Sequence, residues 1–133
     1  MSYNGYLVQV GDYKIPFKYI KSDTYKASKN VQDSDSYRDA NGKLHRTTLS
    51  HIPYKAEFET SPMSSSDFAE MMKNIQRNYT DATERKASVS VYVPEIDSYV
   101  KQDMYMTDVT PIIMNELDGM LFFGNTRIAF IGY

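Results

Sequence analysis

The sequence predicts a mainly β domain of the α+β class: a β-barrel or sandwich of about seven to eight strands, with one amphipathic helix and a long polar arm. Apolar and polar residues alternate in short segments separated by Gly, Pro, Asn and Asp, which is typical of strands joined by tight turns. One segment near the middle has its apolar residues at helical spacing. Another segment, residues 21–43, has very few aliphatic residues and therefore predicts an arm.

Length and composition restrict the possible classes of protein. A chain of 133 residues can bury its own core, so we expect one β-rich domain over residues 1–133. Cysteine is absent, which excludes disulfides and thiolate metal sites. The 15 basic and 17 acidic residues give a net charge of -2 without a basic block, so we expect no nucleic-acid recognition. Neither a signal peptide nor a bilayer-length apolar run is visible, so we expect no membrane partner.

The N-terminal residues predict a hairpin. Residues 6–10 and 13–20 have strand-like composition, and Gly11-Asp12 can form the turn between them. Pro16 cannot donate a ladder hydrogen bond, which would place the second strand at a sheet edge.

Residues 21–43 predict a polar loop or arm. The segment is rich in Lys, Ser, Asp, Asn and Gln and closes on the turn dipeptide Asn41-Gly42. It is longer than the connections that compact domains usually contain. We therefore expect it to become ordered by contact with a neighbouring molecule, for instance along an exposed strand edge.

A long strand and a helix are expected next. Residues 44–60 resume the strand pattern, with Tyr54, Ala56 and Phe58 on one face. A serine-rich stretch then offers N-caps for a helix over residues 65–78. Its apolar face would consist of Phe68, Met71, Met72, Ile75 and Tyr79.

The C-terminal half predicts further strands. Residues 87–93 alternate and are followed by a turn at 94–97 and a strand over 99–106. Residues 112–114 and 121–123 flank the tight turn around Asp118-Gly119, and a last strand covers 126–133. The six methionines that we assign to the core, in preference to an adaptable binding surface, are Met71, Met72, Met104, Met106, Met114 and Met120.

The sequence contains no pattern that predicts catalysis or a bound cofactor. His45 and His51 would share one strand face, but a third ligand at recognisable spacing is missing, so we expect no metal site. Ser64, Ser65 and Ser66 are explained by helix capping, and no nucleophile elbow occurs. We therefore expect a protein that is not an enzyme.

The order of elements resembles that of small structural proteins from the tail modules of phages and prophages of Gram-positive bacteria. The likeness rests on the Arg38-Asp39-Ala40-Asn41-Gly42-Lys43 stretch, the central helix and the aromatic and aliphatic last strand over 127–133. It implies a tail-tube or tail-tip protein with a β-barrel or sandwich flanked by a helix. It also implies an extended loop that reaches the next subunit of a ring in the tail or baseplate.

The same resemblance implies a location and partners. The protein would assemble in the host cytoplasm into a virion tail, and its partners would be copies of itself and other tail proteins. Cyclic rings have heterologous interfaces, so each subunit needs two different surfaces. We expect these on the arm and on the edge strand, since tyrosine and arginine are frequent interface anchors. The candidate residues are Tyr25, Tyr37 and Arg38 on the arm, and Tyr13, Phe17 and Tyr19 on the edge strand.

A second interpretation is a small-ligand or carbohydrate-binding β module. Here the exposed tyrosines Tyr92, Tyr99 and Tyr105 would form a stacking platform. A shallow aromatic groove on a monomeric protein would distinguish this function from the structural one.

Overall fold

The computed structural model describes residues 3–30, 33–48 and 52–133, and for 33–37 and 44–48 it describes the backbone alone. Most of the strands form one antiparallel sheet of seven, in the order β2-β1-β8-β9-β12-β6-β3. These strands are β1 (Val8–Val10), β2 (Tyr13–Lys14), β3 (Lys26–Lys29), β6 (Tyr54–Glu59), β8 (Lys86–Val93), β9 (Ser98–Met106) and β12 (Arg127–Gly132).

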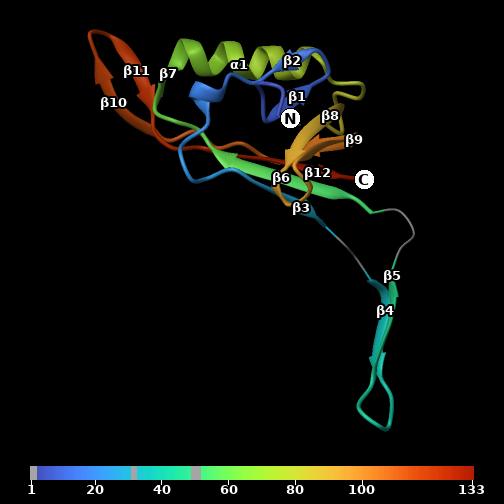
Figure 1. Ribbon diagram of the computed structural model, residues 1–133. Helices are drawn as coiled ribbons and strands as arrows, with labels where there is room; N and C mark the ends of the chain where they lie inside the picture. Colours follow the sequence, from blue (N-terminus) through green and yellow to red (C-terminus); the bar gives the residue numbers. More distant parts are fainter. Residues whose placement is uncertain (1–2, 31–32, 49–51) are drawn as a thin grey trace.

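Two smaller sheets extend from this body. One contains β10 (Ile113–Leu117), β11 (Met120–Phe123) and β7 (Met63–Ser64), and the other is the hairpin of β4 (Asp33–Arg38) and β5 (Leu44–Thr48). Figure 1 shows that the two hairpins leave the body at opposite ends. The described residues also include one α-helix, α1 (Ser65–Arg77), and two short 3-10 helices, η1 (Phe17–Tyr19) and η2 (Pro94–Ile96).

The predicted fold class is confirmed: the protein is mainly β with one helix. Of the two predicted architectures the structure has the sandwich-like one, because the edge strands β2 and β3 do not pair to close a barrel. The number of described strands is larger than expected because several are very short, such as β2 and β7 with two residues each.

The core lies between α1 and the main sheet (Figure 1). The predicted helix begins at Ser65, and the Ser64 hydroxyl caps it by accepting the Asp67 backbone N–H at 3.2 Å. Phe68, Met71 and Ile75 are buried beneath it, as their spacing predicts. Every second residue of β8 is also buried in this core, and each of the three valines among them, Val89, Val91 and Val93, contributes about 1.5–3 kcal/mol.

The methionine prediction is correct for some residues and wrong for others. Met71, Met104 and Met106 are buried. Met114 and Met120 are exposed, because they belong to the β10–β11 hairpin, which extends beyond the core.

The predicted strand over residues 13–20 is wrong beyond Lys14. Pro16 ends the ladder and begins a turn, and the chain then forms η1, where the Ile20 N–H donates to the Phe17 carbonyl at 3.0 Å. Tyr13 therefore lies on an edge strand, as predicted, but Phe17 and Tyr19 do not.

Residues 21–43 do not form one continuous loop. Residues 26–29 form β3, which pairs with β6 at the edge of the main sheet and buries Ala27 opposite Ala56. The projecting element is the β4–β5 hairpin, whose second strand belongs to the segment for which we predicted one long strand over 44–60. The arm is thus a hairpin that draws on both predicted segments.

The longest helix in the described residues is too short and too polar to cross a lipid bilayer.

Candidate subunit interface

Exposed apolar side chains gather on the β10–β11 hairpin, which Figure 1 shows extending beyond the N-terminal end of α1. Ile113 is 62% exposed and Leu117 is 60% exposed. The complete set of exposed large apolar residues in this segment is Ile112, Ile113, Met114, Leu117, Met120 and Leu121. Contiguous apolar surface of this kind on a monomer usually marks a binding surface.

The local sequence explains why this segment is a hairpin. Asp118 and Gly119 both have positive φ, at 53° and 80°, which is the combination that a type I′ hairpin turn requires. The turn places Leu117 opposite Met120. Further from the turn, β10 has a bulge at Met114, beyond which Ile113 pairs with Phe123.

The hairpin is fixed to the body at its base, and near its tip the Met120 sulfur accepts a hydrogen bond from the Ser65 hydroxyl at 3.4 Å. Strand β11 pairs with β7, and the Phe123 ring packs edge-on against Phe68 of α1 with ring centroids 5.3 Å apart. Strand β10 is an edge strand of its sheet, so its outer backbone groups are available for pairing. The hairpin therefore presents apolar side chains and an open strand edge on a fixed base.

Electrostatically, the hairpin is acidic. Residues 110–124 include Glu116 and Asp118 and no lysine or arginine. At its base the surface has a hollow of about 470 Å³. The hollow is lined by Lys18, Tyr19, Pro62, Met63, Ser64, Asp67 and Phe122. One predicted interface residue, Tyr19, thus lies beside the β10–β11 hairpin, which we did not predict as an interface.

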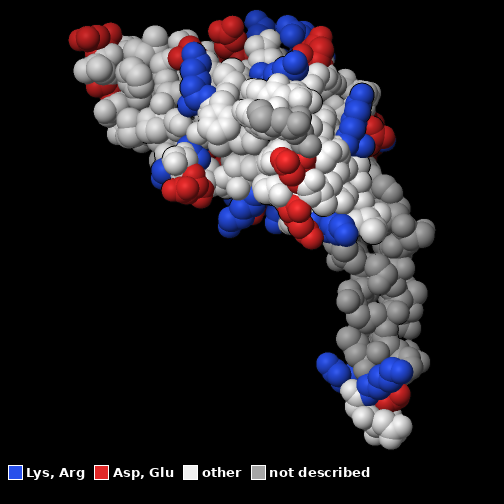
Figure 2. All heavy atoms as spheres, viewed as in Figure 1, with Lys and Arg blue, Asp and Glu red and all other residues white. Residues whose placement is uncertain are grey.

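The second projection is the β4–β5 hairpin, and the Arg-Asp-Ala-Asn-Gly-Lys stretch forms the turn at its tip. One Asp39 carboxylate oxygen accepts the backbone N–H groups of Asn41 at 2.9 Å and of Lys43 at 3.0 Å. Gly42 has a φ of 81°, and its carbonyl accepts a hydrogen bond from Arg38 at 3.0 Å. Basic side chains are visible at this tip in Figure 2. The two projections thus differ in chemistry, since one is apolar and acidic and the other has a polar, basic tip.

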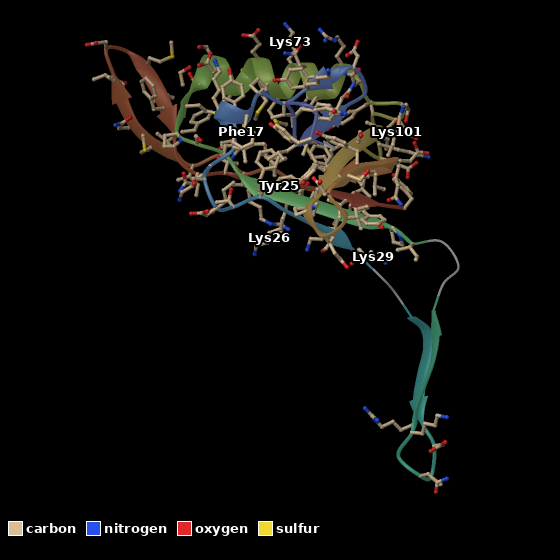
Figure 3. All side chains as sticks on the ribbon, viewed as in Figure 1. Phe17, Tyr25, Lys26, Lys29, Lys73 and Lys101 are labelled. Atoms are coloured by element: carbon tan, nitrogen blue, oxygen red, sulfur yellow. The ribbon has the colours of Figure 1, made fainter. Side chains whose placement is uncertain are left out.

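The arm candidates are separated by the structure. Arg38 is exposed at the hairpin tip. The backbone of Tyr37 pairs with His45 in the same hairpin, and its side chain lies outside the described residues. Tyr25 is not on the arm: its hydroxyl donates to the Tyr92 carbonyl at 2.6 Å, and burial raises its pKa. Its placement on the arm is wrong, because it packs against the core just before β3 (Figure 3).

The other candidates lie around η1 and β2. Phe17 is exposed, and Figure 3 shows it on the short segment below α1. Tyr13 is half-buried, and desolvation raises its pKa, with a further contribution from the nearby Tyr19. The apolar β10–β11 hairpin was missed because we gave weight to tyrosine and arginine. The signal was present in residues 112–123, which have apolar residues at both odd and even positions and therefore on both hairpin faces.

The proposed tyrosine platform is not one surface. Tyr92 and Tyr99 are neighbours with ring centroids 5.5 Å apart, but Tyr6 packs on Tyr99 at 4.7 Å and Tyr3 on Tyr92 at 6.0 Å. The Tyr105 ring instead packs against the Tyr133 ring, with ring centroids 5.6 Å apart. The rings of Tyr92 and Tyr99 are thus already engaged by other tyrosines.

Metal ligands and histidines give no further site. The described residues contain no group of three or more His, Cys, Asp or Glu side chains that could hold a metal ion. The His45 side chain and all of His51 lie outside the described residues.

Comparison with known proteins gives a family and a similar solved structure. A family model described as "Family of unknown function (DUF6711)" matches residues 1–133. A solved structure described as the tail of an empty GTA (gene transfer agent) particle with C6 symmetry has a similar fold, with a TM-score of 0.56 and 12% sequence identity. The match covers 99% of this chain and 95% of that one. A search of curated proteins finds no match.

Proposed function

Because the chain belongs to a family of unknown function, DUF6711, its role has to be inferred from its fold and surfaces, and we propose that it is a non-enzymatic structural protein of a phage or prophage tail. In this role it makes subunit–subunit contacts in the tail tube, the tail tip or the baseplate. The observation that carries the proposal is the exposed apolar β10–β11 hairpin, which is costly to leave in water and is covered in an assembly.

The fold and the second projection support the proposal. The fold is similar over nearly its whole length to that of a protein solved within a C6-symmetric tail. The single domain carries two hairpins of different chemistry at opposite ends, and a cyclic ring needs two different surfaces on each subunit. In this proposal the β4–β5 hairpin is the arm that reaches a neighbouring subunit, with Arg38 and Tyr37 among its contacts.

The proposal includes a source and a location. The protein belongs to a phage or prophage of a Gram-positive host, assembles in the host cytoplasm and ends in the virion tail. Its partners are copies of itself and adjacent tail proteins.

The test is the solution mass of the purified chain, measured by light scattering over a concentration series and followed by electron microscopy of the largest species. Rings, tubes or a mass that rises with concentration are expected. A monomer at every concentration, with no binding to any protein encoded in the same tail module, would contradict the proposal.

A further inference from the structure

We infer that the β10–β11 hairpin of one copy docks into a hollow at the C-terminal end of α1 in a second copy, an inference that rests on the proposed self-association. The hollow has a volume of about 450 Å³, within the range of roughly 300–1,000 Å³ in which protein pockets hold a ligand. We call it the acceptor hollow. Its lining includes Met72, Met106, Val109, Ala82, Tyr79 and Arg85.

The acceptor hollow is suited to apolar side chains. Met72 and Val109 are partly buried and pack on the core, and Met106 is buried beside them. Leu117 and Leu121 of the hairpin are exposed and need such a surface. Burial of apolar side chains from both partners is the main driving force for association in water.

Charge also favours this pairing. The hairpin tip carries Glu116 and Asp118 and no basic residue. Arg85 is the one charged residue among those lining the acceptor hollow, and its ion pair with Asp108 at 2.6 Å is solvent-exposed and therefore weak. Two further basic side chains, Lys73 and Arg77, are exposed on the second half of α1, and Lys73 is labelled in Figure 3.

Two hydroxyl groups at this end of the protein lack hydrogen-bond partners. Within the described residues, the Tyr79 hydroxyl and the Thr107 hydroxyl are buried and make no hydrogen bond. Tyr79 lines the acceptor hollow, and Thr107 lies between Met106 and Val109 in the sequence. Buried polar groups normally have partners, so these two hydroxyls reduce the stability of this end of the protein.

The positions of the two surfaces set the kind of assembly. The hairpin is anchored at the first turn of α1 through Phe68, whereas Tyr79 lies just beyond the last helical residue. The 13 residues of α1 are about 20 Å long, so the two surfaces are at opposite ends of this helix. A contact between different patches is heterologous and repeats from copy to copy, which gives a ring when the rotation closes and a filament when it does not.

The test uses two variants that each remove one surface. Leu117→Asp places a carboxylate on the hairpin, and Ala82→Glu places one in the acceptor hollow; both positions are exposed, so the melting temperature should stay at the wild-type value. Each variant alone should be monomeric under conditions in which the wild type assembles. Mixed at equal concentration they should form a 1:1 dimer, because one copy still offers an intact hairpin and the other an intact hollow. Ile96→Asp, at an exposed apolar position on η2, is the matched control and should assemble like the wild type.

A second measurement uses the absence of native cysteine. Leu117→Cys mixed with Ala82→Cys should give a disulfide-linked dimer under mild oxidation, whereas Leu117→Cys mixed with Ile96→Cys should not. If the wild type assembles but the two carboxylate variants do not combine, or if Ala82→Glu assembles normally, the inference is wrong while the proposed function stands. If the wild type stays monomeric and the Leu117→Cys and Ala82→Cys variants form no cross-link, the inference is wrong, and the proposed function then depends on binding to other proteins of the tail module.

Discussion

Leu117→Asp tests whether the apolar hairpin drives association, and its effect can be worked from the exposure of one side chain. Leu117 is 60% exposed, and complete burial of a leucine side chain is worth about 1.5–3 kcal/mol. Covering the remaining surface is therefore worth about 1–2 kcal/mol, so Leu117→Ala should weaken association about 5- to 30-fold. Aspartate adds the cost of an unpaired polar group at the interface, about 1–3 kcal/mol, so Leu117→Asp should weaken association about 30-fold or more.

The assay is sedimentation equilibrium or light scattering of the wild type, Leu117→Ala, Leu117→Asp and Ile96→Asp at matched concentrations. Thermal unfolding of each variant in dilute solution controls for folding, because an exposed substitution should change the free energy of unfolding by less than about 0.5 kcal/mol. Two results would refute the reasoning: assembly of Leu117→Asp with wild-type affinity, or an equal loss of assembly in Ile96→Asp.

Three further predictions concern the arm and the stability of the body. Replacing residues 33–48 by a short Gly-Ser linker should leave the melting temperature near that of the wild type, because the hydrogen bond from the Asn30 N–H to the Pro53 carbonyl at 2.8 Å closes the base of the arm without these residues. The same replacement should reduce assembly, because it removes the arm. If electron micrographs show the same assemblies as the wild type, the arm is not a contact. Tyr25→Phe should lower the free energy of unfolding by about 0.5–1.5 kcal/mol in denaturant titration, because it removes the hydrogen bond to the Tyr92 carbonyl, and it should leave assembly intact. The Arg127 hydrogen bond lowers the pKa of Glu57, so the pair stabilises the folded state above the unfolded pKa of Glu57, and this contribution is lost as pH falls through the folded pKa. Glu57→Gln should therefore cost at most about 1 kcal/mol at pH 7, since the pair is partly exposed, and should flatten the acid side of a stability–pH curve; an unchanged curve would contradict this.

Local patterns in the sequence were enough to predict several elements. The alternation from Ala87 to Val93 predicts β8 with one buried face. In the structure the buried residues of this strand are Ala87, Val89, Val91 and Val93. The serine-rich stretch before Phe68 predicts the start of α1, and Ser64 caps it. These features depend on side-chain spacing and capping within a few residues, which any single sequence displays.

The candidate site was only partly predictable. Interface residues were expected among tyrosines and arginine, and the structure places Arg38 at an exposed hairpin tip but turns the Tyr25 hydroxyl inward to the Tyr92 carbonyl. Whether a tyrosine faces solvent or a distant carbonyl depends on residues far away in the chain. Residue type alone does not contain that information.

By itself, then, the sequence determined a β-rich domain with one capped helix, the turn at Asp118-Gly119 and the absence of thiol chemistry. Only the tertiary structure decided that residues 26–29 join the main sheet, that β12 lies between β9 and β6, and that the hairpin around Leu117 projects beyond the core with its apolar side chains exposed. The physical reason is that strand order and burial result from pairings between segments far apart in the sequence. A local pattern of apolar residues can predict a strand, but it does not determine whether another part of the fold covers that strand.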